Sequence, residues 1–239
     1  MTGARTLPQG SRIAVVDDDR DDAATWTRLL KDYGFRPEPI SEFEPAQSAD
    51  SFLEQLRGRY DAVVADHVLS GRRRVGFTGA ELVCKANQSS PTPLPSVLIS
   101  SHVNTDETHA IALWRSGIPA LVDKSELSGQ LLDALELTVN ELAGKIARER
   151  RPITTPIEIL DIGERSETPT AKVIVVGWKI ATSVLMPLEP ICDATGLKPE
   201  QLPGTWLEAD VNCYAKDPTD LYFRNIMLAP PLDEDWFPE

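Results

Sequence analysis

The stretch IAVVDDDRDD, residues Ile13–Asp22, decides the fold of the first half of the chain. Two β-branched valines end an apolar run that leads directly into three consecutive aspartates, Asp17, Asp18 and Asp19. A short, continuous apolar run of this kind predicts a buried strand of a parallel sheet. Adjacent carboxylates repel one another unless a cation or hydrogen bonds compensate them. The stretch therefore predicts a strand that ends at a site where positive charge is expected.

The residues up to about 150 alternate between strand-like and helix-like blocks, and this alternation is typical of a parallel sheet. Glycine, serine and aspartate at the ends of the helix-like blocks fit helix termini. The pattern predicts an α/β fold with a doubly wound, five-stranded parallel sheet. The predicted strands are 12–16, 36–40, 61–66, 96–101 and 120–123, and the predicted helices are 21–34, 48–59, 78–87, 105–117 and 125–149.

Polar side chains follow the strands at the edge where such a sheet binds ligands. The first strand ends at Asp17 and Asp18, the third at Asp66, the fourth at Ser100, and the fifth runs into Lys124. Carboxylate oxygens with room for water suit Mg²⁺, which usually also takes an anionic ligand such as phosphate. Lysine and serine are suitable donors around that phosphate.

A simpler interpretation is open for each of these residues. Asp17 and Asp18 could form an exposed acidic loop at a helix N-terminus, where carboxylates are favoured. Asp19 fits a helix cap better than a metal ligand. Lys124 alone could be a solvated loop lysine, and Ser100 a strand-end hydroxyl that bonds the backbone.

Four segments in this order resemble the response-regulator receiver domain of two-component signalling, the CheY-like family. IAVVDDD resembles the acidic pair after its first strand, YDAVVADHVLSG its phosphoacceptor strand and loop, VLISS its fourth strand, and GIPALVDKS its lysine segment. The resemblance covers about residues 11–147. It implies a flavodoxin-like receiver fold and Mg²⁺ as cofactor. It also implies a sensor histidine kinase or phosphotransfer protein as partner.

The resemblance also implies a role for each matching residue. Asp66 would be phosphorylated, and Ser100 and Lys124 would contact the phosphoryl group. The implied Mg²⁺ ligands are Asp17, Asp18, Asp66 and the backbone carbonyl of Val68.

Several positions depart from the family pattern. Leu121 stands where many receivers have a rotating Tyr or Phe switch, Ser125 where proline follows the lysine, and Ser70 where the loop commonly has proline. A leucine can pack inward, but it has no large ring to reorient. The cis bond that a proline favours is therefore in doubt after Lys124.

The loop after Asp66 is longer than the family's usual stretch and contains Arg72, Arg73 and Arg74. These arginines are either a solvated loop or a surface for an acidic partner or the phosphoryl group. His67 and His102 flank the site and are either packing residues or modulators of water access.

The predicted helix 125–149 is longer than a sheet-covering helix needs. Its apolar residues recur at helical spacing, so its second half either packs within the chain or pairs with a second subunit as a homodimer. The stripe consists of Leu127, Leu131, Leu135, Val139, Leu142 and Ile146.

The sequence divides into an N-terminal tail (1–10), a receiver domain with an extended last helix (11–149), a proline-marked linker (150–157) and an acidic β-rich domain (158–239). In the last part, 157–163, 170–180, 206–216 and 221–228 fit strands, the last two as a hairpin. The stretch 188–197 fits a short helix. Its aromatic residues are either core or a binding surface: Trp178, Trp206, Tyr214, Tyr222, Phe223 and Trp236.

The composition excludes several classes of function. A net charge of −13 argues against affinity for nucleic acid or anionic membranes, which need clustered Lys and Arg. No apolar run is long enough to span a bilayer, and the N-terminus lacks a signal-peptide pattern, so we expect a cytoplasmic protein. Three widely spaced cysteines indicate neither a disulfide framework nor a zinc site.

Three hypotheses remain for the function. The first is a response regulator whose Asp66 phosphorylation controls a protein-binding C-terminal domain. The second is a receiver that gates an enzyme of unknown activity in that domain, although no catalytic motif is evident there. The third is a receiver-like scaffold that is not phosphorylated. The sequence favours the first.

Overall fold

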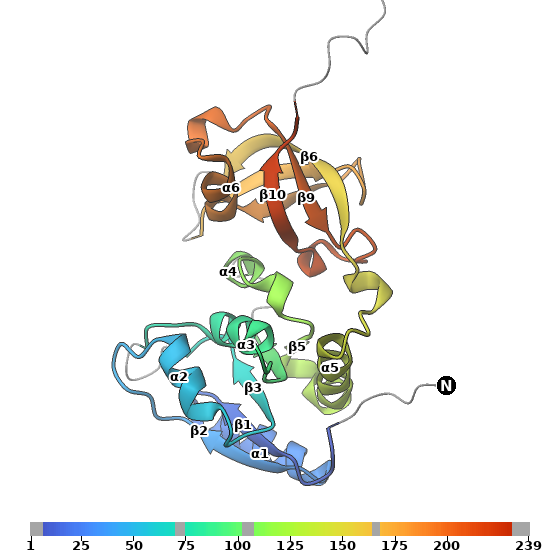
Figure 1. Ribbon diagram of the computed structural model, residues 1–239. Coiled ribbons are helices and arrows are strands. Elements are labelled where there is room, and N and C mark those ends of the chain that lie inside the picture. Colours follow the sequence, from blue (N-terminus) through green and yellow to red (C-terminus); the bar gives the residue numbers. More distant parts are fainter. Residues whose placement is uncertain (1–6, 70–74, 102–107, 164–167, 231–239) are drawn as a thin grey trace, which may run out of the picture. The chain divides into compact units, whose positions relative to one another are not determined.

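The computed structural model describes residues 7–69, 75–101, 108–163 and 168–230 (Figure 1). The chain forms two compact units, residues 1–147 and 148–239, each with its own five-stranded sheet. Among the described residues, no helix is long and apolar enough to cross a membrane.

The first unit contains a parallel sheet with the strand order β2-β1-β3-β4-β5. This is the flavodoxin-like order of a doubly wound sheet, so the receiver-type fold predicted from the sequence is confirmed. Its strands are β1 (Arg12–Val16), β2 (Arg36–Ile40), β3 (Ala62–Asp66), β4 (Ser96–Ser100) and β5 (Leu121–Asp123). Its helices are α1 (Arg20–Asp32), α2 (Ala49–Leu56), α3 (Gly79–Gln88), α4 (Thr108–Ala112) and α5 (Leu127–Leu142).

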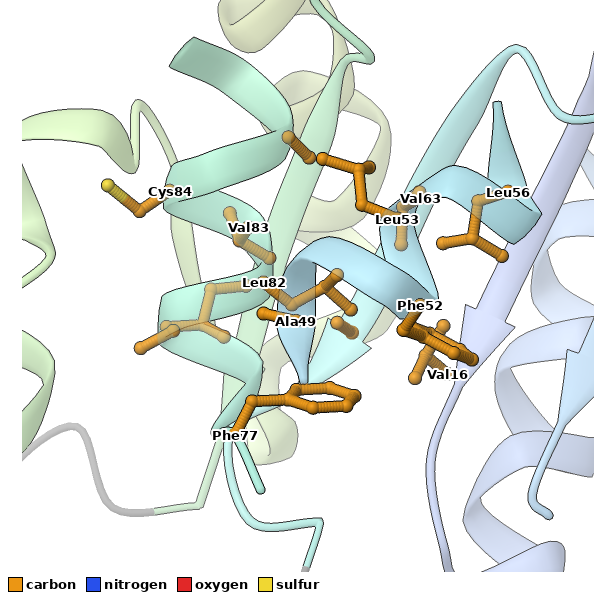
Figure 2. Packing of buried hydrophobic residues seen from close by; sticks show 14 of the residues in the cluster. Val16, Ala49, Phe52, Leu53, Leu56, Val63, Phe77, Leu82, Val83 and Cys84 are labelled. Atoms are coloured by element: carbon orange, nitrogen blue, oxygen red, sulfur yellow. The ribbon is translucent and has the colours of Figure 1, made fainter. Parts of the chain in front are cut away.

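Helices cover both faces of this sheet, which is why its central strands are apolar on both sides. On one face, Trp26 and Leu30 of α1 and Leu131 of α5 pack against the alternate residues Ile13 and Val15 of β1. On the other face, α2 and α3 supply most of the cluster shown in Figure 2. There the rings of Phe43, Phe52 and Phe77 contact one another, with centroids 5.4–6.4 Å apart.

Helix α5 is shorter than the predicted helix 125–149. It ends at Leu142 because Gly144 adopts a left-handed conformation (φ 83°). The amide of Gly144 donates to the Glu141 carbonyl (2.9 Å), and the amide of Lys145 donates to the Asn140 carbonyl (2.8 Å). These two bonds form a Schellman cap. Ile146, the last residue of the predicted stripe, consequently lies beyond the helix and is exposed.

The second unit is an antiparallel sheet with the order β10-β9-β6-β7-β8. One face packs against α6 (Leu188–Thr195), and the predicted short helix and the predicted hairpin of β9 and β10 are both present. Strand β8 was missed, because the short segment SVLMP ends in a proline and has few residues to show a pattern. The strands are β6 (Ile153–Gly163), β7 (Thr170–Val175), β8 (Ser183–Pro187), β9 (Trp206–Val211) and β10 (Phe223–Leu228).

The stretch 150–157, interpreted from the sequence as a linker, is built into the second unit. Strand β6 starts at Ile153, inside that stretch. The fully buried Asn212 donates from its amide to the carbonyls of Glu149 and Asp220 and accepts from the Tyr222 amide, at 2.8–3.0 Å. Prolines mark an edge or a bend as readily as a linker, so composition alone could not place this boundary.

Gly79, the first residue of α3, lies against the backbone of Asp66. Its amide donates to the His67 carbonyl (3.0 Å), and a Cβ at this position would lie only 1.7 Å from the Asp66 carbonyl oxygen. Only a residue without a side chain allows α3 to begin here.

We predict that Gly79→Ala destabilises the first unit, because the backbone at Asp66 must move to admit the methyl group. The matched control is Gly129→Ala in α5, where a Cβ meets no atom within 4 Å. There, alanine should stabilise the helix by up to about 1 kcal/mol. Urea unfolding of the full chain measures both variants, and equal stabilities for the two would contradict the prediction.

Candidate functional site

The carboxyl ends of four parallel strands meet at one edge of the first sheet and position the candidate site. Asp17 follows β1, and its amide continues the ladder to β2 by donating to the Ile40 carbonyl (3.2 Å). Asp66 is the last residue of β3 and Ser100 the last of β4. Lys124 follows β5 directly. Parallel pairing thus brings together residues that are far apart in the sequence.

Three carboxylates converge at this edge. One oxygen from each of Asp17, Asp18 and Asp66 lies within 4.8 Å of the others. Asp17 and Asp66 are buried, with 0% and 5% of their surface exposed, while Asp18 is half-buried. Buried carboxylates this close together need compensating positive charge.

Asp19 is a helix cap, as expected, and is not part of the carboxylate group. Its side chain accepts hydrogen bonds from the amides of Asp21 (2.8 Å) and Asp22 (3.2 Å) and so starts α1. Its own amide donates to Asp17 Oδ1 at 2.8 Å. The cap therefore fixes one oxygen of Asp17 and also the first turn of α1.

Lys124 supplies the positive charge of the described site. Its Nζ lies 3.2 Å from Asp66 Oδ1 and 3.7 Å from Asp17 Oδ2. It also donates a hydrogen bond to Asp22 Oδ2 at 2.9 Å and lies 5.0 Å from the centre of the Trp26 ring. One ammonium thus contacts three carboxylates and the face of an aromatic ring.

The second oxygen of Asp17 is incompletely compensated. Asp17 Oδ2 is buried and accepts no hydrogen bond, and its described ionic contact is the long one to Lys124. A buried carboxylate oxygen without a donor is costly. It is also the arrangement expected of a ligand to a hard divalent cation, which prefers carboxylate oxygens. The residues present therefore fit a Mg²⁺ site.

Burial and charge shift the pKa values of these groups. Burial is the largest cause that raises the pKa of Asp17, to about 7, although the Asp19 amide opposes it. Burial also raises the pKa of Asp66, against the lowering effect of Lys124 and of the backbone at His67 and Val68. Burial would lower the pKa of Lys124, but its hydrogen bond to Asp22 and the charges of Asp66 and Asp17 raise it overall. The ammonium therefore stays charged at neutral pH.

The remaining predicted residues take different places. Ser100 is fully buried beside β5, and His67 is buried directly after Asp66. Leu121 is half-buried and packs on the core of the α2 and α3 face. The described residues have one cis peptide bond, at Ser90–Pro91 and not after Lys124. Ser70, Arg72, Arg73, Arg74 and His102 lie outside the described residues.

Ser125, which stands where the resembled receiver family has proline, forms a turn with Asp123. Its amide and its hydroxyl both donate to Asp123 Oδ1, at 2.8 and 2.6 Å. These bonds bracket Lys124 between two residues that are fixed to one another.

Sequence reasoning missed Asp22 and Trp26, which contact Lys124. Both lie on α1 four residues apart, and this spacing puts them on the same side of a helix. The signal was therefore present in the sequence, but nothing in the strand pattern connects this face of α1 to a lysine that follows β5.

Comparisons with known proteins find similar chains among the solved structures. No protein-family model and no curated protein matches the chain. Among solved structures, the chain is similar to a sensor protein from Polaromonas sp. JS666 (22% identity, 55% of this chain and 98% of that one, TM-score 0.39). It is also similar to a response regulator receiver protein from Pseudoalteromonas atlantica (18%, 54% and 98%, 0.40). A third is a response regulator from Thermotoga maritima described in complex with Mg²⁺ and BeF (18%, 55% and 98%, 0.38).

The buried Asp17 makes the stability of the metal-free protein depend on pH. Its pKa of about 7 when folded exceeds the ordinary 3.8, so the folded protein binds more protons between these values. Stability should therefore fall as the pH rises from about 4 to about 7. We predict that Asp17→Asn removes part of this fall and stabilises the protein by about 1–3 kcal/mol at pH 8.

Urea unfolding at pH 5 and pH 8 with a chelator present measures this effect. Asp21→Asn, an exposed position on α1, is the control. If wild type and Asp17→Asn lose the same stability between the two pH values, the account of Asp17 is wrong.

Proposed function

We propose that the chain is a two-component response regulator in which Asp66 accepts a phosphoryl group. The observation that supports this most strongly is the bond between Lys124 and Asp66 (3.2 Å) beside the carboxylates of Asp17 and Asp18. A structural ion pair would need one carboxylate for one ammonium. This site has an excess of carboxylates, including an oxygen with no donor.

The proposed reaction is an in-line phosphoryl transfer. An oxygen of Asp66 forms a bond to phosphorus as the phosphorus–nitrogen bond of a phosphohistidine breaks, and the imidazole leaves. The attacking carboxylate must be ionised, and Lys124 opposes the effect of burial that would protonate it. Positioning and charge compensation are the main contributions a protein can make to this chemistry.

Mg²⁺ fits the acidic group as the cofactor. Asp17, Asp18 and Asp66 would hold it together with the Val68 carbonyl, and when bound it supplies positive charge to the transferring phosphoryl oxygens. Ser100 and Lys124 would then donate to the remaining oxygens. A histidine kinase or a phosphotransfer protein would be the phosphoryl donor.

We propose that the second unit is the output part and that it binds another protein. One face of its sheet packs on α6, and on the opposite face most of the described side chains of β6, β8 and β9 are exposed or half-buried. Trp206, Leu185 and Met227 project from this opposite face, each about half exposed (45–53%). Glu158 pairs with Trp206, and Glu208 pairs with Met227. Leu185 pairs with Lys172. Exposed apolar side chains with polar neighbours mark protein-binding surfaces, where aromatic residues and Met are enriched.

The aromatic residues of this unit accordingly divide between core and surface. Tyr222 is buried, and its hydroxyl donates to the Arg150 carbonyl at 2.6 Å. Trp178 and Phe223 are partly buried against the core, while Trp206 and Tyr214 are exposed. Trp236 lies outside the described residues.

We predict that the full chain gains one phosphoryl group when it is incubated with acetyl phosphate and Mg²⁺. The added mass should disappear in Asp66→Asn, which keeps the shape of the side chain but removes the attacking carboxylate. Intact-mass spectrometry measures the gain. No gain in the wild type, under conditions that label a known receiver, would leave the scaffold hypothesis as the better one.

We also predict that Mg²⁺ raises the melting temperature of the wild type, because a ligand that binds only the folded protein stabilises it by mass action. Asp18→Asn should reduce this gain, since it removes a half-buried ligand and leaves the core intact. Thermal unfolding over a Mg²⁺ series tests both statements, with Asp50→Asn on α2 as the exposed control. An equal gain in all three proteins would place the cation elsewhere.

A further inference from the structure

Asp22 has a contact that the proposed reaction does not use. Its Oδ2 accepts a hydrogen bond from Lys124 Nζ at 2.9 Å, which is shorter than the distance from Nζ to Asp66 (3.2 Å) or to Asp17 (3.7 Å). Its side chain is 46% exposed, whereas that of Asp66 is 7% exposed. The nearest anion to the ammonium is therefore a partly solvated residue outside the carboxylate group Asp17–Asp18–Asp66.

The position of Asp22 is fixed by the first turn of α1. The Asp22 amide donates to the Asp19 cap at 3.2 Å, and the Asp19 amide donates to Asp17 Oδ1 at 2.8 Å. The backbone of Asp22 is thus tied to the site through two hydrogen bonds. The fold therefore fixes the backbone position from which the short Asp22 side chain contacts Lys124.

Trp26 supports the same position of the ammonium. The ring is buried (1% exposed), lies one helical turn after Asp22, and has its centre 5.0 Å from Lys124 Nζ. A cation near an aromatic face is stabilised by the ring quadrupole. Asp22 and Trp26 together hold the ammonium from the side of α1.

We propose that Asp22 is a positioning residue that competes with the phosphoryl group for Lys124 and so limits how strongly the site holds a phosphoryl group. This inference rests on the proposed function of Asp66. Lys124 has three N–H donors, and in the described structure one is directed to Asp22. A phosphoryl group on Asp66 brings new acceptor oxygens and negative charge. Because Lys124 carries a single positive charge, the bond to Asp22 reduces how strongly the ammonium attracts these oxygens.

The competition predicts the effect of removing the charge at Asp22. Asp22→Asn keeps an acceptor oxygen of the same size but makes it a much weaker partner for the ammonium. Lys124 is then freer to pair with an anion on Asp66. We expect such an anion to bind about threefold to tenfold more tightly, the scale of one unit charge acting over a few ångströms at a partly solvated site.

The experiment measures binding of beryllium trifluoride, a phosphoryl mimic, to the full chain at saturating Mg²⁺ by isothermal titration calorimetry. The matched control is Asp21→Asn, which removes the same charge from the same turn of α1 at an exposed position. At 0.15 M salt the charge of Asp21 is largely screened from the site, so this control should change affinity less than about twofold. Asp22→Glu, which keeps the charge, should stay near wild type.

Direct repulsion between Asp22 and the phosphoryl group is the competing explanation. It would persist when Lys124 is replaced, whereas competition for the ammonium would not. In a double-mutant cycle, Asp22→Asn should therefore tighten binding in the wild type and have little effect in Lys124→Gln. If Lys124→Gln does not bind, the initial rate of phosphorylation by acetyl phosphate replaces affinity in the same cycle. In that reaction Asp66 bonds to phosphorus as acetate leaves.

The outcomes separate this inference from the proposed function. A wild type that neither binds the mimic nor accepts a phosphoryl group overturns the proposed function, and the role of Asp22 with it. A wild type that does both, while Asp22→Asn behaves like Asp21→Asn, overturns the role of Asp22 alone. If Asp22→Asn tightens binding equally with and without Lys124, the role of Asp22 is also overturned, because the effect is then direct repulsion between Asp22 and the phosphoryl group.

Discussion

The candidate site depends on the ion pairs that the ammonium of Lys124 forms with its neighbouring carboxylates. The ammonium is a single positive charge that contacts Asp66, Asp17 and Asp22 at the end of a parallel sheet. Without it, the buried carboxylates would favour protonation, and a protonated carboxylic acid is a poor nucleophile. The fold delivers the lysine from β5, the strand at one end of the sheet order, to the ends of β1 and β3 near its centre. The parallel topology therefore brings the positive charge of Lys124 to the buried carboxylates.

The two units cover the faces of their sheets in different ways. In the first, helices cover both faces, so nearly every residue of the central strands β1, β3 and β4 is buried, and the carboxyl ends of these strands are where polar side chains gather. In the second, α6 covers one face and the alternate residues of β9 remain accessible on the other. An edge suits a small group such as a phosphoryl, whereas an open face suits a larger partner.

Much of the first unit could be predicted from the sequence, because each of its central strands is a short apolar run and Asp17, Asp66 and Lys124 stand directly at strand ends. The contact of Asp22 with Lys124 could not, since it depends on which way α1 turns over the sheet. The end of α5 was missed although Gly144 marks it, because the apolar stripe continues past the glycine to Ile146. In the second unit, the predicted strand 206–216 contains β9, whose alternate residues Leu207, Ala209 and Val211 are buried. The course of 150–157 depends on pairing with the distant strand β9, and a local pattern does not show such a contact.

The hydrogen bond from the Gly79 amide to the His67 carbonyl joins the two ends of the loop that separates β3 from α3. Since the loop is closed at its base, residues can be added between these ends at a small entropic cost and without pulling on Asp66. The segment that distinguishes this chain from the family it resembles, with its run of arginines, is inserted there. The sequence of the loop can therefore change while the backbone at the end of β3 keeps its position.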